Sequence, residues 1–169
     1  MPHAPKHMLA LIKGPDSYER SFGWRPAEGL RDFIVSKDVS PDYLERLDAS
    51  VDSDPWTHGF GLISLSTGTV IGFGGFKGPP GADGVVEIAY GVVPDYQGKG
   101  FATEAAQALV AYAFNSGRVR MVRAHTRPEP NPSTRVLAKC GFRHMGEVAD
   151  PEDGLVWRWE KVNETDKSI

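Results

Sequence analysis

The decisive stretch of the sequence reads Asp95-Tyr96-Gln97-Gly98-Lys99-Gly100-Phe101-Ala102-Thr103-Glu104-Ala105-Ala106. The preceding residues Val85–Val93 (VVEIAYGVV) predict a strand whose even positions form one apolar face. The alanine-rich segment Ala102–Asn115 predicts a helix. A glycine turn at a helix start exposes backbone N–H groups that the helix cannot pair, and the helix dipole adds attraction for an anion. The stretch therefore predicts a phosphate-binding turn between a strand and a helix.

The patterning on both sides of this turn predicts a mixed α/β domain. We expect residues 1–162 to form one domain and residues 163–169 to form a polar tail. Residues 8–13 fit a strand or a short helix equally well. The predicted helices are 16–22, 27–35, 41–47, 102–115 and 131–140, and the predicted strands are 58–65, 69–76, 85–93, 121–127, 142–148 and 155–161.

Composition excludes several functional classes. The chain has 169 residues and a net charge of −3, which argues against wholesale binding of nucleic acid or an anionic membrane. The single cysteine, Cys140, excludes an internal disulfide and favours a reducing compartment. No apolar run approaches a transmembrane span, and the N-terminal residues show no secretory pattern, so we expect a cytoplasmic protein. The five histidines are scattered and no Cys/His ligand spacing is present, so no metal is expected.

Two separated motifs resemble those of the GCN5-related N-acetyltransferase (GNAT) superfamily. The stretch Gln97–Ala102 fits the family signature Q/R-x-x-G-x-G/A at every fixed position, and residues 90–105 are similar to the branch with ribosomal-protein N-terminal acetyltransferases. That branch also has an Asn, a Ser and a helix ending in Gly-Phe, here Asn131, Ser133 and Gly141-Phe142. The resemblance covers roughly residues 60–160. It implies a mixed, mostly antiparallel sheet of six to seven strands with a central splayed strand pair, flanked by helices.

The resemblance implies that the phosphate is the pyrophosphate of acetyl-CoA, used as a cosubstrate. The turn amides would wrap the pyrophosphate, while Lys99 would add a cation or stay solvated. The family splays two strands near the position of Gly91, where we expect a bulge and a Val92 N–H that meets the thioester carbonyl. The implied acetyl-CoA-binding residues are Val92, Val93, Gln97, Gly98, Lys99, Gly100, Phe101, Ala102, Asn131 and Ser133. The alternative is a glycine-rich helix start without a ligand.

Acetyl transfer needs a base for the amine and an acid for the departing thiolate. Glu87, on the strand face opposite Val86 and Ile88, is the candidate base; the alternatives are a solvated glutamate and a structural ion pair. Ser133 is the candidate acid, because Leu137 stands where many family members have a tyrosine. A helix-cap serine is the equally weighted alternative.

Two further side chains have competing interpretations. Asn131 would bind the pantetheine arm or cap the helix that begins with Pro132, and one residue could do both. His125 is a weaker candidate base, since a face shared with Arg123 and Arg127 more often faces solvent.

We expect an acetyl-CoA-dependent N-acetyltransferase in which a small-molecule or peptide amine attacks the thioester directly in a ternary complex. The alternatives are an acyl-CoA sensor without turnover and an enzyme for a longer acyl-CoA, with room around Gly72, Gly74 and Gly75. The acceptor pocket would come from the N-terminal helices and from the loops after the first strands, where the resemblance is least. Dimers are common in such families, so the resemblance implies a homodimer as one expected oligomeric state.

Overall fold

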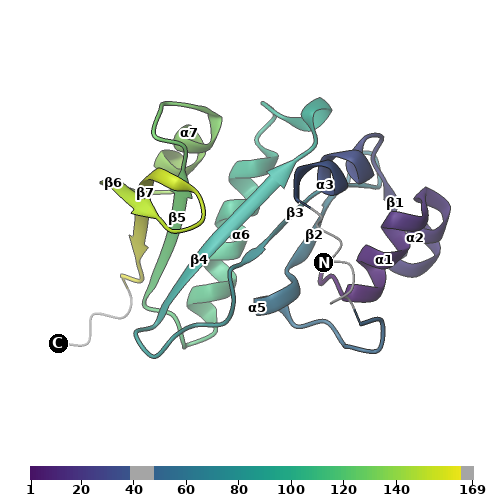
Figure 1. The fold of residues 1–169 in the computed structure, drawn as a ribbon, viewed down its shortest axis with the longest axis horizontal. Helices are drawn as coiled ribbons and strands as arrows, with labels where there is room; N and C mark the ends of the chain where they lie inside the picture. Colours follow the sequence, from purple (N-terminus) through teal and green to yellow (C-terminus); the bar gives the residue numbers. More distant parts are fainter. Residues whose placement is uncertain (39–47, 165–169) are drawn as a thin grey trace. The chain divides into compact units, whose positions relative to one another are not determined.

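The computed structural model describes residues 1–38 and 48–164 (Figure 1). The predicted helix at 41–47 and most of the predicted tail lie outside the described residues. The chain divides into two compact units, each built from two segments. The first unit comprises Met1–Gly75 and Gly91–Gln97, and the second comprises Phe76–Tyr90 and Gly98–Ile169. The single domain over residues 1–162 stays a prediction.

The described residues form a mixed α/β fold with a mostly antiparallel set of seven strands, as the sequence predicts. Residues 8–13, left open between strand and helix, are helical, and the two-residue strand at 25–26 was not expected. The helices are α1 (Pro5–Lys13), α2 (Pro15–Phe22), α3 (Leu30–Asp38), α5 (Pro55–His58), α6 (Phe101–Asn115) and α7 (Pro132–Lys139), with the 3-10 turn η1 (Pro94–Tyr96). The strands are β1 (Arg25–Pro26), β2 (Phe60–Ser64), β3 (Thr69–Phe76), β4 (Val85–Val92), β5 (Met121–Thr126), β6 (Arg143–Asp150) and β7 (Gly154–Val162).

In the first unit, β3 pairs with β2 antiparallel and with β1 parallel. The predicted hairpin turn after β2 is present and contains Gly68 at φ 67°. The returning segment of this unit is tied to β3, because the Val93 N–H donates to the Ile71 carbonyl at 2.8 Å. Buried Leu11, Leu30 and Ile71 contribute to the hydrophobic core of this unit.

Gly72 marks a close approach of two backbone segments within the first unit. A Cβ added at Gly72 would collide with the carbonyl oxygen of Gly91 and would lie 3.0 Å from the Val92 Cα. A Cβ at Gly75 would likewise lie 3.0 Å from the Gly59 Cα. The open room expected around Gly72 and Gly75 is therefore wrong at these two positions, because backbone atoms occupy it.

A buried histidine near the start of the chain makes the stability of the first unit depend on pH. His3 is 3% exposed, its Nε2 lies 3.1 Å from the Tyr18 hydroxyl, and its ring packs edge-on against Phe73. Burial, assisted by the nearby His7, lowers the pKa of His3 from 6.5 to about 3. The imidazole therefore stays neutral in the folded protein at pH values where the unfolded chain already binds a proton.

We expect acid to destabilise the protein through His3. The pKa of His3 is lower in the folded protein than in the unfolded chain. Its contribution to the free energy of unfolding is therefore fully present above pH 6.5 and is lost as the pH falls toward about 3. This group alone contributes a slope of about 1.4 kcal/mol per pH unit inside that window. Urea unfolding between pH 7 and pH 4 measures how the free energy of unfolding changes with pH in the wild type and in His3→Gln. His144→Gln is the control, because His144 is exposed. Equal slopes in wild type and His3→Gln would contradict the assignment.

In the second unit, β4 runs parallel to β5, and β5 and β6 both pair antiparallel with β7. The β4–β5 register ends at Glu87↔Arg123, although β4 continues to Val92 and β5 to Thr126. Figure 1 shows these two strands diverging, which confirms the predicted splayed pair. The divergence begins directly after Glu87, four residues earlier than the expected position at Gly91. Helix α6 packs against β5 with buried Ala106 and Leu109 on its inner face.

Candidate active site in the gap between two strands

A pocket of about 460 Å³ opens in the second unit where β4 and β5 diverge. Its volume is within the range typical of small-ligand sites. It brings together the two candidate catalytic residues, Glu87 from β4 and Ser133 from α7. Its lining residues are Lys77, Glu87, Ile88, Ala89, Tyr90, Ala124, His125, Thr126, Arg127, Ser133, Leu137, Asp153, Leu155 and Val156.

Glu87 projects from β4 on the face opposite buried Val86 and Ile88, as the alternation predicts. Its side chain is 20% exposed, and its Oε2 lies 2.8 Å from the Lys77 Nζ. The Lys77 N–H also donates to the Glu87 carbonyl at 2.9 Å, so backbone pairing sets the two side chains beside each other. The hydrogen bond to Glu87 raises the pKa of Lys77. Glu87 is thus held in an ion pair while it still faces the pocket, so the structure excludes only the freely solvated alternative.

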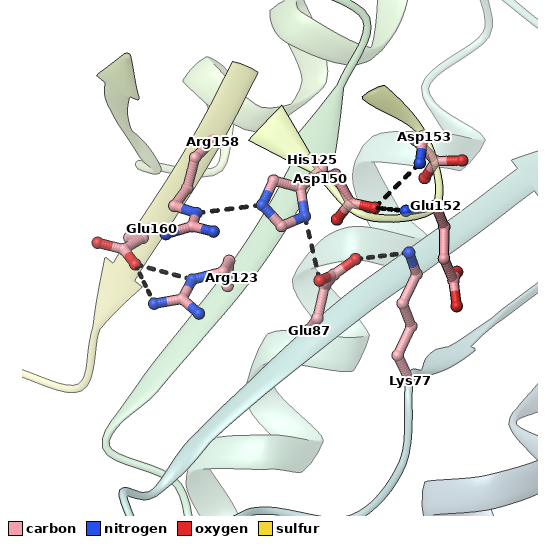
Figure 2. A network of polar contacts seen from close by, with 9 residues as sticks. All are labelled: Lys77, Glu87, Arg123, His125, Asp150, Glu152, Asp153, Arg158 and Glu160. Atoms are coloured by element: carbon pink, nitrogen blue, oxygen red, sulfur yellow. Dashed lines mark hydrogen bonds and ion pairs between the residues drawn. The ribbon is translucent and has the colours of Figure 1, made fainter. Parts of the chain in front are cut away.

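His125 lies on the other side of the same carboxylate (Figure 2). Its Nδ1 is 3.1 Å from Glu87 Oε1, and its Nε2 is 3.1 Å from the Nε of Arg158, which comes from β7. The His125 side chain is only 7% exposed. The solvent-facing position expected for His125 is therefore wrong, because the side chains of Arg158 from β7 and Glu87 from β4 lie against its ring.

The strand register explains why these side chains meet. Successive residues of a strand alternate between faces, so residues directly opposite each other on paired strands share a face. Arg123 is in register with Glu160 and its Nη2 lies 2.8 Å from Glu160 Oε2. His125 is in register with Arg158 one pleat further along. The result is a row of polar cross-strand contacts that ends at Glu87 (Figure 2).

The turn between β6 and β7 contributes to the wall of the pocket. Asp150 Oδ1 accepts hydrogen bonds from the N–H groups of Glu152 at 2.8 Å and Asp153 at 3.0 Å. These two bonds lower the pKa of Asp150, with Glu152 the larger contributor. They fix the turn that carries Asp153 and Leu155 to the pocket wall.

The start of α7 separates the roles of Asn131 and Ser133. Asn131 is the N-cap: its Oδ1 accepts from the Thr134 N–H at 2.9 Å, and Thr134 Oγ1 accepts from the Asn131 N–H at 3.0 Å. The predicted cap is therefore confirmed for Asn131, and among the described residues its side-chain NH₂ donates to nothing. Ser133 follows Pro132 inside the helix, so the cap-serine alternative is wrong. Its exposed side chain lines the pocket, as the acid hypothesis requires.

The glycine turn before α6 has the backbone expected of an anion cradle. Gly98 and Gly100 have φ values of 75° and 90°, and a Cβ at either position would meet nothing within 4 Å. The first hydrogen bond into α6 runs from the Glu104 N–H to the Gly100 carbonyl. The amides of the first helical turn, at Phe101 and Ala102, therefore precede the first intrahelical bond. This part of the turn belongs to the second unit, as does Lys99.

The other predicted acetyl-CoA contacts lie in the first unit, where several of their groups are already used. Gln97 donates through its side-chain amide to the Val92 carbonyl at 2.8 Å and through its N–H to the Pro94 carbonyl at 3.1 Å. Gln97 thus shapes the turn: its backbone N–H is used, and its side-chain NH₂ keeps one N–H beyond the bond to Val92. The Val93 N–H is likewise bonded to Ile71. The bulge and the thioester contact expected at Gly91 and Val92 stay predictions.

Tyr90 places a buried hydroxyl at the pocket wall. Within residues 1–38 and 48–164, no hydrogen-bond partner reaches this hydroxyl. Burial raises its pKa, and the nearby Cys140 adds to the shift. Buried polar groups normally find partners, so an unpartnered hydroxyl beside a pocket fits a site that takes a polar ligand.

Two features are absent from the residues that the structure describes, 1–38 and 48–164. Among them, no three His, Cys, Asp or Glu side chains lie where they could share a metal ion. Within the same residues, no helix combines the length and the apolar character needed to span a bilayer.

Sequence reasoning did not identify Lys77, Arg158 or Tyr90 as parts of this site. Arg158 reaches His125 through a strand pairing that joins distant parts of the chain, and Lys77 reaches Glu87 through a backbone bond to a residue ten positions later. No local pattern of residue types specifies such partners. Tyr90 carried a signal that could have been used, since a tyrosine on the buried face of a strand needs a partner for its hydroxyl.

Comparison with known proteins supports one family. The family model "Acetyltransferase (GNAT) domain" matches residues 8–143. An "Uncharacterized N-acetyltransferase p20" from Bacillus licheniformis is 37% identical over 55% of this chain and 52% of its own length. A "Probable N-acetyltransferase YjcK" from Bacillus subtilis is 32% identical over 82% of this chain and 67% of its own length. The chain thus spans about half of the first of these two relatives.

Solved structures agree on the fold. A GNAT-family acetyltransferase from Bacillus anthracis has a TM-score of 0.54 and 27% identity, covering 61% of this chain and 64% of its own. A ribosomal-protein-S5-alanine acetyltransferase from Vibrio fischeri has a TM-score of 0.65 over 97% of this chain and 92% of its own. Its identity is 16%, so that likeness concerns the fold alone.

Proposed function

Because the chain belongs to the GNAT acetyltransferase family, we propose that it is a cytoplasmic enzyme that transfers an acetyl group from acetyl-CoA to a primary amine. The observation that carries this proposal is the pocket where β4 and β5 diverge, with Glu87 and Ser133 in its lining. Acetyl-CoA supplies the acetyl thioester. Gly98, Gly100 and the first turn of α6 suit its pyrophosphate, and the buried Tyr90 hydroxyl and the NH₂ of Asn131 offer polar groups toward its pantetheine arm.

Two residues of the pocket can carry out the two proton transfers of the reaction, one from the acceptor ammonium and one to the departing thiolate. An alkyl ammonium has a pKa near ~10, so the acceptor must lose a proton before its nitrogen can attack. Glu87 takes this proton, directly or through a water molecule, before the new C–N bond forms. Ser133 gives a proton to the departing thiolate as the C–S bond breaks, and its hydroxyl regains a proton from the second N–H that the nitrogen loses as the amide forms. Glu87 then returns its own proton to solvent. No side chain becomes covalently bound, so both substrates are present together in a ternary complex.

The acceptor is proposed only as a class: a primary amine of a small molecule or a peptide. The two Bacillus relatives are named N-acetyltransferases with no acceptor specified, and the Vibrio fischeri protein is named a ribosomal-protein-S5-alanine acetyltransferase. A homodimer likewise stays a prediction. A screen of amines, with the released thiol as the readout, identifies the acceptor once binding of acetyl-CoA is established.

The cofactor is tested by calorimetric titration with acetyl-CoA, with CoA and ATP as comparison ligands. We expect binding that Gly100→Glu weakens about 100-fold or more, because the new carboxylate faces the pyrophosphate. Gly117→Glu is the matched control: Gly117 follows the other end of α6, has φ 74° and has nothing within 4 Å of an added Cβ. Equal effects of the two substitutions would mean that strain, and not the phosphate site, explains the loss.

Binding without turnover would favour the alternative, an acyl-CoA sensor. A sensor keeps the glycine turn but has no need of Glu87 or Ser133 as proton carriers. Absence of acetyl-CoA binding by the wild-type protein would overturn both functions.

Ser133→Ala tests the acid separately. We expect kcat to fall about 10- to 100-fold with an unchanged Kd for acetyl-CoA, because the hydroxyl matters only when negative charge develops on sulfur. Steady-state kinetics with the selected amine measure it, and an acetyl donor with a better leaving thiol should partly restore the rate. A variant with full kcat would contradict the acid assignment.

A further inference from the structure

The contacts of His125 determine where its proton lies. Arg158 donates from its Nε to His125 Nε2 at 3.1 Å. A guanidinium has donors and no acceptor, so Nε2 must present a lone pair. A neutral imidazole carries one N–H, which leaves the proton on Nδ1. That nitrogen lies 3.1 Å from Glu87 Oε1.

Nδ1 has no competing partner. It is buried, and among the described residues no acceptor satisfies hydrogen-bond geometry with it. The Glu87 Oε1 atom lies within hydrogen-bond distance of Nδ1 but is misaligned, so the bond forms only if the ring or the carboxylate turns. The other oxygen of the carboxylate, Oε2, is held by Lys77 at 2.8 Å. Lys77 and His125 therefore contact the two oxygens of Glu87 from opposite sides (Figure 2).

We propose that His125 is a positioning residue for Glu87: it acts as a fixed Nδ1–H donor whose tautomer Arg158 sets. This inference rests on the proposed function, in which Glu87 is the base. It excludes His125 as a second base, because Arg158 occupies the only lone pair on its ring. It also assigns Arg158, which is not among the residues lining the pocket, a part in aligning the proton acceptor.

The tautomer can be read without any substrate. Nitrogen-15 NMR of labelled histidine distinguishes a protonated ring nitrogen from an unprotonated one, and loss of a signal set in His125→Asn assigns the residue among the five histidines. In the wild type we expect a single form of His125, with a proton on Nδ1 and none on Nε2. In Arg158→Met we expect an Nε2–H form to appear. An Nε2–H form or an imidazolium in the wild type, or an unchanged tautomer in Arg158→Met, would overturn the proposal.

Two substitutions of His125 separate positioning from packing. The amide nitrogen of His125→Asn can take the place of Nδ1 and donate to Glu87, whereas the amide of His125→Gln reaches the position of Nε2. We expect His125→Asn to keep kcat close to the wild type and His125→Gln to lose about 10- to 100-fold, with KM for acetyl-CoA unchanged in both. Equal losses in both variants would mean that His125 only fills space.

Arg123→Gln is the matched control for these variants. It removes the neighbouring cross-strand pair with Glu160 on the same strands but leaves Glu87, His125 and Arg158 in place. We expect it to lower stability without changing kcat; a kcat loss equal to that of His125→Gln would count against a specific role. If the wild type turns over no amine, the proposed function fails, while the NMR experiment still decides the state of His125.

Discussion

Glu87→Gln is expected to reduce kcat by about 100- to 10,000-fold, the range in which general acid–base catalysis contributes. The amide keeps the shape of the side chain and a contact to Lys77, but it cannot accept the proton of the acceptor ammonium. Calorimetry should give an unchanged Kd for acetyl-CoA, because Glu87 acts on the amine. The acidic limb of the pH profile of kcat should disappear together with the carboxylate.

Glu160→Gln is the control for this experiment. Glu160 is a second carboxylate in an ion pair on the same set of strands, yet it does not line the pocket. We expect it to leave the acidic limb and kcat in place. An unchanged kcat and pH profile in Glu87→Gln would show that Glu87 has only a structural role, in its ion pair with Lys77. Another group would then be the base.

Gly72→Ala is expected to lower the free energy of unfolding by about 3 kcal/mol or more, because overpacking against backbone cannot be relieved by a rotamer change. The added methyl group would collide with the Gly91 carbonyl and crowd the Val92 Cα. Gly72 lies outside the positive-φ glycines, so the cost is steric rather than conformational. Urea unfolding followed by circular dichroism measures the change.

Gly81→Ala is the matched control for the steric argument. A Cβ at Gly81 would meet only the Asp83 carboxylate, at 3.0 Å, and that side chain can move away. We expect its effect to stay within about 0.5 kcal/mol. A similar small effect in Gly72→Ala would show that β3 and the segment after Tyr90 can separate more easily than their close contact indicates.

Local patterns predicted the elements that carry the site. The alternation in 85–93 placed Glu87 on the correct face of β4, and the Asn-Pro pair placed the cap of α7 at Asn131. The positive φ values of Gly98 and Gly100 agree with the turn that the glycine signature predicts. Each of these features depends on residues within a few positions of one another, which is why the sequence alone was informative.

The partners of the side chains could not be predicted in the same way. The position of His125 depends on the register between β5 and β7, and that of Lys77 depends on a backbone bond to a residue ten positions later. An error of one residue in register would exchange the two faces of a strand. A residue such as His125 therefore looked like part of an exposed polar face until its partner strand was known.

The divergence of β4 and β5 has a consequence for the behaviour of the protein at high concentration. Beyond Glu87↔Arg123, β4 and β5 are no longer paired with each other, so each strand has an unpaired edge there. Unpaired strand edges favour pairing with strands of other molecules. Charged side chains are a common protection against that pairing, and here Glu87 and Arg127 stand along the opening together with the polar imidazole of His125. Replacing several of these polar residues with apolar ones would therefore promote aggregation even where the folded structure is preserved.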